Sequence, residues 1–236
     1  MCGIFGWLGD PGEWGLAHRL MVELAIASEQ RGVDAAGFAA MTPGGELLWQ
    51  RQPGPARALF QGEEFRALRR WRIVMAIGHT RLATKGTPAV NGNNHPHLAG
   101  DWAVVHNGSI PCHRAAAACL GVPLESECDS EVLAQILSRY GEERGPDICL
   151  AVGGKQSVLA INARTRTMLA WTNGEMPLVA FRVEDMPAVW WASTEEIAEK
   201  ALEAVDLQAR FAAPEPGLVY RMEVRGGQVV ANRARI

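Results

Sequence analysis

The sequence predicts an α+β protein. Short apolar segments with the character of strands recur along the chain, and pairs of helical segments interrupt them without a regular strand–helix–strand alternation. The 236 residues are enough to build a substantial core, and we expect residues 1–236 to form a single domain. The sequence contains no internal repeat and no low-complexity tract.

The first third of the chain begins with a short buried strand. Residues Gly3 to Leu8 are apolar and glycine-rich, and the turn sequence Gly-Asp-Pro-Gly follows them. Leucines spaced four residues apart from Leu16 predict a helix that ends near Arg31 and Gly32. The next predicted elements are strands over 35–41 and 46–50, a helix over 55–70 and a strand over 73–77 that runs into residues 78–81.

A long segment rich in Gly, Pro and Asn, residues 82–100, comes next, and a loop of this length in a compact domain is usually functional. The elements predicted after it are a strand over 102–105, helices over 112–120 and 129–139, and strands over 157–161, 167–171, 178–181 and 189–191. Ser193 or Thr194 caps a helix that extends through Glu203. A hairpin of strands 218–224 and 228–230 closes the chain across Gly226-Gly227.

Composition excludes several classes of partner. The formal net charge is -3 with 21% charged residues, so neither nucleic acid nor an anionic membrane is expected to bind. There is no long apolar run and no charged-then-apolar leader, so we expect neither a membrane span nor a signal peptide. Five cysteines without a Cys-x-x-Cys pair indicate reduced thiols and a cytoplasmic protein.

Cys2 is the strongest indication of chemistry. Removal of Met1 would leave a thiol and a free α-amine on the same residue. The amine can take the proton while the thiolate attacks a carbonyl, because the two groups have ordinary pKa values of about 8 and about 8.5. A cysteine at position 2 also occurs by chance, so the remaining motifs decide the interpretation.

Four further segments are unusual: Arg31-Gly32-Val33-Asp34, the run from Gly78 to Gly86, Asn93-Asn94-His95-Pro96-His97, and His106-Asn107-Gly108. Together with the Cys2 opening, they resemble the class II glutamine amidotransferases, which are N-terminal-nucleophile hydrolases, in particular the glutaminase domain of glucosamine-6-phosphate synthase. The resemblance continues through residues 127–131 and 191–194. It implies a four-layer α/β/β/α sandwich of two antiparallel sheets.

The resemblance also implies the site residues. Cys2 would be the nucleophile, while the Asn107 side chain and the Gly108 backbone N–H would bind the oxyanion. Arg81 and Thr84 would bind the α-carboxylate of the substrate, and Asp129 would bind its α-ammonium. Arg31 and Gly32 would shape the pocket around the nucleophile's amine. Two positions depart from the family pattern beside Arg81: Leu82 replaces an aromatic residue and Lys85 replaces a histidine.

Structural interpretations of these residues remain open. Asn107-Gly108 is also a common turn sequence, and Asp129 precedes a helical pattern as an N-cap would. Arg81 could form a surface ion pair, while Arg31 and Gly32 could mark a helix end. The histidines near His95-x-His97 suggest a metal, but without a second, well-spaced ligand pair we expect neither a metal nor a cofactor.

The resulting hypothesis is hydrolysis of L-glutamine to L-glutamate and ammonia through a Cys2 thioester, with ammonia passing to a separate synthase subunit. One alternative is a stand-alone amidohydrolase acting on another γ-glutamyl amide. Another is a non-catalytic binding or regulatory module, which retention of Met1 would favour because the nitrogen of Cys2 would then be an amide.

Overall fold

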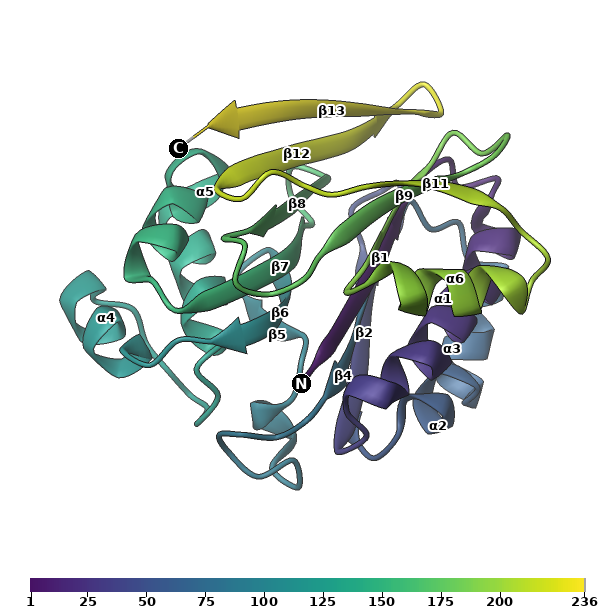
Figure 1. The fold of residues 1–236 in the computed structure, drawn as a ribbon. Helices are drawn as coiled ribbons and strands as arrows, with labels where there is room; N and C mark the ends of the chain where they lie inside the picture. The colour runs from purple at the N-terminus through teal and green to yellow at the C-terminus, as the bar shows by residue number, and fades with distance from the viewer. Residues whose placement is uncertain (236) are drawn as a thin grey trace.

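The computed structural model describes residues 1–235, which form two facing antiparallel β-sheets with helices on both outer sides (Figure 1). The first sheet has the order β11-β9-β10-β1-β4-β2-β3. Its strands are β1 (Gly3–Leu8), β2 (Ala35–Met41), β3 (Leu47–Pro53), β4 (Met75–Arg81), β9 (Val179–Val183), β10 (Val189–Ala192) and β11 (Ala209–Ala212).

The second sheet has the order β13-β12-β8-β7-β6-β5. Its strands are β5 (His97–Ala99), β6 (Trp102–Ser109), β7 (Lys155–Asn162), β8 (Thr167–Thr172), β12 (Leu218–Arg225) and β13 (Gln228–Arg235). All of the described strand pairs in both sheets are antiparallel. The prediction of an α/β/β/α sandwich is therefore confirmed.

Helices cover the outer face of each sheet (Figure 1). The first sheet carries α1 (Trp14–Ser28), α2 (Ala56–Phe60), α3 (Glu63–Ala67) and α6 (Glu195–Glu203), and the second carries α4 (His113–Leu120) and α5 (Glu131–Val152). Short 3-10 turns are η1 (Glu29–Arg31), η2 (Leu68–Arg70) and η3 (Asn91–Asn93). None of the helices within residues 1–235 combines the length and apolar character that crossing a membrane requires.

Strand β1 shows why the central strands appear in the sequence as continuous runs of apolar residues. Successive side chains of a strand point to opposite faces of the sheet. Phe5 and Trp7 pack into the core under α1, whereas Ile4 and Leu8 join the core between the two sheets. Because both faces of β1 are covered, all six of its residues are buried.

Most predicted elements are confirmed, two predictions are wrong, and two strands, β5 and β11, were not predicted. The helix expected over 55–70 is broken because Gly62 adopts an extended backbone between α2 and α3. The helix expected to end near Arg139 continues, after a non-helical residue at Gly141, through Val152. Strand β11 was not predicted, because its alternation of half-buried and exposed residues carries a weak apolar signal.

Candidate active site

The ends of three strands gather at one edge of the sandwich, and the N-terminus lies there (Figure 1). Cys2 precedes β1, and the pairing of Gly3 with Thr80 brings it beside Arg81 at the end of β4. Strand β6, which packs against β1 and β4 from the second sheet, ends with Asn107, Gly108 and Ser109. The sheet topology thus brings together residues that are about a hundred positions apart in the sequence.

Cys2 is half-buried and held by neighbours on both sides. Its Sγ lies 3.6 Å from the carbonyl oxygen of Leu82, and its own carbonyl accepts a hydrogen bond from Arg31 Nε at 2.6 Å. Burial raises the pKa of the Cys2 thiol, while the Leu82 contact and the positive charges of the N-terminus, Arg81 and Arg31 lower it by smaller amounts. The thiol is therefore predominantly protonated at neutral pH and needs a base.

Ala103 and Val105 on β6 point toward the first sheet. Because every second side chain of a strand lies on the same face, Asn107 points toward the first sheet as well. Its side chain is buried, and its Nδ2 has no hydrogen-bond partner among the described residues. A buried amide donor without a partner is costly, so it is rarely retained without a use. The site accordingly contains a donor that a developing oxyanion could accept from.

Gly108 has a structural requirement of its own. A Cβ at this position would lie 1.8 Å from the carbonyl oxygen of Lys155 on β7. Asn107 and Gly108 pair with Ser157 and Gln156 within the β6–β7 ladder. The interpretation of Asn107-Gly108 as a plain turn is therefore wrong, because the pair belongs to a strand.

Arg81 is almost fully buried, with 3% of its surface exposed. Its Nη1 donates to Asn94 Oδ1 at 2.8 Å, and its Nη2 donates to the carbonyl oxygens of Lys85 and, at 2.9 Å, Gly86. The interpretation as a surface ion pair is wrong for this residue. Its guanidinium is a buried fork directed at the loop beside Cys2.

Asp129 is also buried, and its Oδ2 accepts a hydrogen bond from the backbone N–H of Ile110 at 2.6 Å. The carboxylate therefore links the start of α5 to the end of β6 and does not cap the helix. The same oxygen lies 3.7 Å from Lys85 Nζ. Thr84, by contrast, is exposed, and its side chain makes no hydrogen bond with any residue between 1 and 235.

The segment from Arg31 to Asp34 fixes the loop after β4. A Cβ on Gly32 would lie 2.4 Å from both the carbonyl carbon of Arg81 and the nitrogen of Leu82, so only glycine allows this approach. The Asp34 nitrogen donates to the Arg81 carbonyl at 2.9 Å, and Asp34 Oδ2 accepts from Ala83 at 2.8 Å. The interpretation of Gly32 as a helix end holds, since it follows the 3-10 turn η1, and its role in the site stays a prediction.

Two histidines that sequence reasoning left without a role connect the sheets. His79 Nε2 lies 3.2 Å from the carbonyl oxygen of His106, which joins β4 to β6. His106 in turn contacts Ser130 Oγ at 2.8 Å and the Lys155 carbonyl at 3.0 Å. Asn107 is adjacent to His106, Asp129 is adjacent to Ser130, and Arg81 lies two residues after His79, so these contacts help to position all three. In the sequence, the only indication of a role for His79 and His106 is that they lie within the Gly78–Gly86 and His106-Asn107-Gly108 motifs.

His95, His97 and Cys128 form a buried cluster in which one ligand atom from each lies within 4.8 Å of the others. These donor types can bind zinc or copper. Burial, followed by the charges of Arg51 and Arg81, lowers the pKa of His97 to about 3. A metal dication would meet the same two guanidinium charges, so we keep the expectation that the protein binds no metal as a prediction.

The loop expected over 82–100 is more ordered than its composition indicates. It contains η3 and β5, and residues 93–97 are buried. Asn93 Oδ1 accepts from the Glu127 nitrogen at 2.8 Å, and Asn94 Nδ2 donates to the Pro88 carbonyl at 2.9 Å. The exposed part is confined mainly to residues 82–92.

Known proteins resemble this chain in sequence and in fold. Glutamine–fructose-6-phosphate aminotransferase (isomerizing) of Caulobacter vibrioides is 39% identical over 157 residues, which cover 65% of this chain and 23% of that protein. The Corynebacterium glutamicum protein of the same name is 33% identical over 194 residues, covering 76% of this chain and 30% of its own length. No family model matches the sequence.

Two solved structures share the fold. Glutamine phosphoribosylpyrophosphate amidotransferase from B. subtilis superposes with a TM-score of 0.73 at 22% identity over 98% of this chain and 49% of that one. A glutamine aminotransferase class-II domain protein from Silicibacter pomeroyi superposes with a TM-score of 0.59 at 16% identity over 98% of both chains.

The two solved structures show that this chain, whose second residue is a cysteine, shares the fold of those two proteins. Taken with the sequence relatives at 39% and 33% identity, they support a class II glutamine amidotransferase. The chain spans between a fifth and a third of the length of the curated relatives it matches. Its own substrate, acceptor and partner are therefore matters for proposal.

Proposed function

We propose that the protein hydrolyses L-glutamine to L-glutamate and ammonia, with residues 1–236 acting as one glutamine amidotransferase type-2 domain. The observation that carries the proposal is the unpartnered, buried Asn107 amide at the strand edge where Cys2, Arg81 and Asp129 also lie. An acyl-transfer site needs such a donor near its nucleophile.

The proposed reaction begins after Met1 is removed. The free α-amine of Cys2 takes the thiol proton, directly or through one water, and the sulfur attacks the side-chain amide carbon of glutamine. Asn107 Nδ2 and the Gly108 N–H stabilise the oxyanion of the tetrahedral intermediate. The amine returns the proton to the leaving nitrogen, so ammonia departs and a γ-glutamyl thioester remains. Water then attacks the thioester and releases glutamate.

Arg81 and Asp129 would bind the end of glutamine that does not react. Arg81 offers a planar fork for the α-carboxylate, and Asp129 offers an anion for the α-ammonium. Thr84, exposed beside them, adds a hydroxyl for the carboxylate, while Arg31 and Gly32 shape the region around the Cys2 amine. This pair of opposite charges would select an α-amino acid.

The test uses a glutamine analogue that carries an electrophilic diazoketone in place of the amide. Processed protein, shown by intact mass to lack Met1, should gain one analogue, and peptide mapping should place it on Cys2. Excess glutamine should slow the labelling. Labelling of other cysteines alone, or no protection by glutamine, would contradict the proposal. Faster turnover of γ-glutamyl peptides than of glutamine would favour the stand-alone amidohydrolase.

We further propose that a separate synthase subunit accepts the ammonia at this edge. Val33 and Leu82 are 49% and 43% exposed, and both lie on the segments that hold Arg81 and Cys2. Exposed apolar side chains around a reactive site are suited to a protein contact that excludes water. Co-purification followed by a glutaminase assay with and without the recovered protein tests this, and Val33→Asp or Leu82→Asp should abolish the association.

A further inference from the structure

The loop after β4 occupies both ends of the amino-acid clamp formed by Arg81 and Asp129. Lys85 Nζ lies 3.7 Å from Asp129 Oδ2, while the carbonyl oxygens of Lys85 and Gly86 accept from Arg81 Nη2. An ammonium therefore faces the carboxylate, and two oxygens face the guanidinium. This is the charge pattern of an amino acid's own α-ammonium and α-carboxylate.

We propose that Lys85 and Gly86 act as an internal occupant of the clamp, which an amino-acid substrate must displace, and that Lys85 thereby sets the affinity of the site. The inference rests on the proposed function, because it takes Arg81 and Asp129 as the substrate clamp. It adds Lys85 to the residues that determine substrate affinity, at a position where the resemblance in sequence has a histidine.

The two ends of the clamp respond differently to a substrate. At Arg81 an incoming carboxylate replaces neutral carbonyl oxygens, so the exchange gains charge-assisted hydrogen bonds. At Asp129 an incoming ammonium replaces another ammonium, so the exchange gains no charge pairing. The cost of displacement therefore falls on the Lys85–Asp129 pair.

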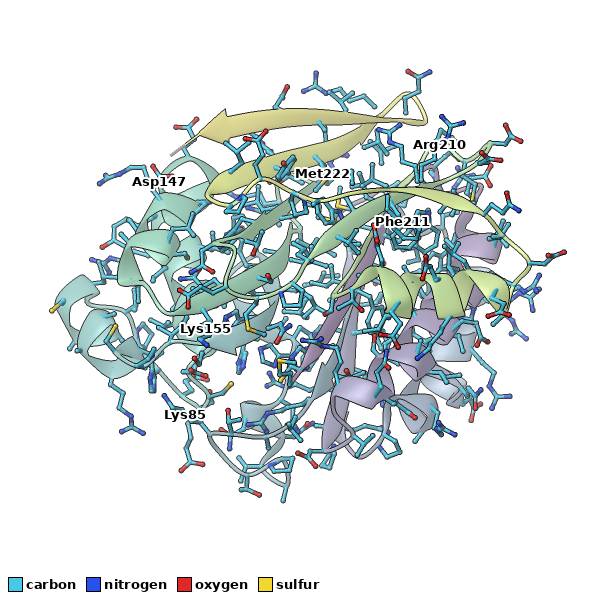
Figure 2. All side chains as sticks on the ribbon, viewed as in Figure 1. Lys85, Asp147, Lys155, Arg210, Phe211 and Met222 are labelled. Carbon is cyan, nitrogen blue, oxygen red and sulfur yellow. The ribbon has the colours of Figure 1, made fainter. Side chains whose placement is uncertain are left out.

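The position of Lys85 allows it to leave. Its side chain is 40% exposed, whereas that of Asp129 is 8% exposed. Lys85 projects from the loop after β4 near the lower edge of the molecule in Figure 2, so its ammonium can return to water while Asp129 stays in place. The contacts at both ends of the clamp come from two adjacent residues, so one movement of this segment would free them together.

The experiment measures equilibrium binding by calorimetry in a Cys2→Ala background, which cannot turn the substrate over. L-glutamine is compared with its deamino analogue, 4-carbamoylbutanoate, which lacks the α-ammonium. Lys85→Met should bind L-glutamine about three- to fivefold more tightly, the scale of a partly exposed ion pair. Binding of the deamino analogue should change less than twofold, because it does not compete for Asp129.

Two further variants serve as controls. Lys85→Arg keeps the positive charge and should retain the weaker binding. Arg210→Met removes an exposed positive charge on β11, which Figure 2 labels at the upper right, away from Lys85, and should leave both affinities unchanged. A general effect of net charge would appear in this variant as well.

The outcomes separate the two proposals. If Lys85→Met binds glutamine no better, or more weakly, the internal occupant is overturned while the proposed function stands. An equal gain for glutamine and the deamino analogue also overturns it, because the effect would then not involve Asp129. If no variant binds glutamine, the proposed function fails, and the inference fails with it.

Discussion

At the scale of single residues, the site combines a nucleophile that needs a base with a donor that needs an acceptor. Burial raises the pKa of the Cys2 thiol, and Asn107 Nδ2 is buried without a partner among residues 1–235. The unpartnered Asn107 amide costs stability in the absence of substrate. A tetrahedral intermediate on Cys2 would satisfy both at once, since the sulfur becomes bonded and the amide gains an oxyanion.

Asn107→Leu tests the donor. Leucine has a similar size and removes the amide, so kcat for glutamine hydrolysis should fall about 100- to 1,000-fold. KM should change less than threefold, because Asn107 is proposed to act on the intermediate and not on the bound amino acid. Steady-state kinetics measure both quantities. A large rise in KM with unchanged kcat would assign Asn107 to substrate binding.

At the scale of elements, the loop after β4 depends on close backbone contact with the residues that follow η1. Gly32 touches the Arg81–Leu82 peptide, and Asp34 bonds to the residues on either side of Leu82. The position of Arg81 is thus set by a segment about fifty residues earlier in the chain. Substitutions in that segment should therefore change the position of Arg81 and the affinity for the substrate.

Gly32→Ala is expected to displace the clamp. The added methyl would lie 2.4 Å from backbone atoms of Arg81 and Leu82, so the loop must move. We expect KM for glutamine to rise at least about tenfold, since a small misplacement of a positioning group can cost ~100-fold.

Gly15→Ala is the matched control, because a Cβ there meets no atom within 4 Å. Gly15 lies in the first turn of α1, where alanine should leave unfolding free energy equal or raise it by ~0.5 kcal/mol. Its kinetics should match those of the parent. If both variants have the same KM, Gly32 does not position the clamp.

Much of the fold could be predicted from the sequence, because the strands have apolar runs and the turns have glycines. Thr194 caps α6 as expected, accepting from the Ile197 nitrogen at 3.3 Å. Contacts between sheets could not be predicted. The link from His79 to His106 and the pairing of Lys85 with Asp129 depend on packing across the sandwich, and the approach of Cys128 to His95 and His97 depends on the packing of α5 on β5.

At the scale of the whole molecule, a cluster of neutral histidines is buried beside the candidate site. The rings of His79 and His95 stack with centroids 3.8 Å apart, and His95 and His97 meet edge to face at 4.6 Å. Burial, with smaller contributions from neighbouring positive charges, lowers the pKa values of His79 and His95 well below the ordinary range. The neutral forms are therefore part of the folded state.

These histidines should make stability fall as the solution is acidified. The unfolded chain binds protons near pH 6.5, whereas folded His97 binds one only near pH 3. Between these values the unfolded state holds more protons, so the unfolding free energy decreases as pH falls. At pH 5 the loss is about 2 kcal/mol for His97.

Urea unfolding at pH 7 and pH 5 measures this decrease in the unfolding free energy. His97→Gln should reduce the difference between the two pH values, because it removes one titrating group. His18→Gln is a useful comparison, since His18 lies in the other core under α1 and burial lowers its pKa less strongly. An unfolding free energy that is equal at the two pH values would contradict the assignment of neutral buried histidines.

The measurement that tests the central proposal most directly is ammonia release from L-glutamine by protein whose intact mass shows that Met1 is absent. Glutamate and ammonia should form in equal amounts, alone or with the recovered partner. Cys2→Ala should reduce the rate to background while its thermal unfolding stays cooperative. Full activity in Cys2→Ala would contradict the proposed mechanism. A processed, folded protein that is inactive with and without its partner would identify a non-catalytic member of the family.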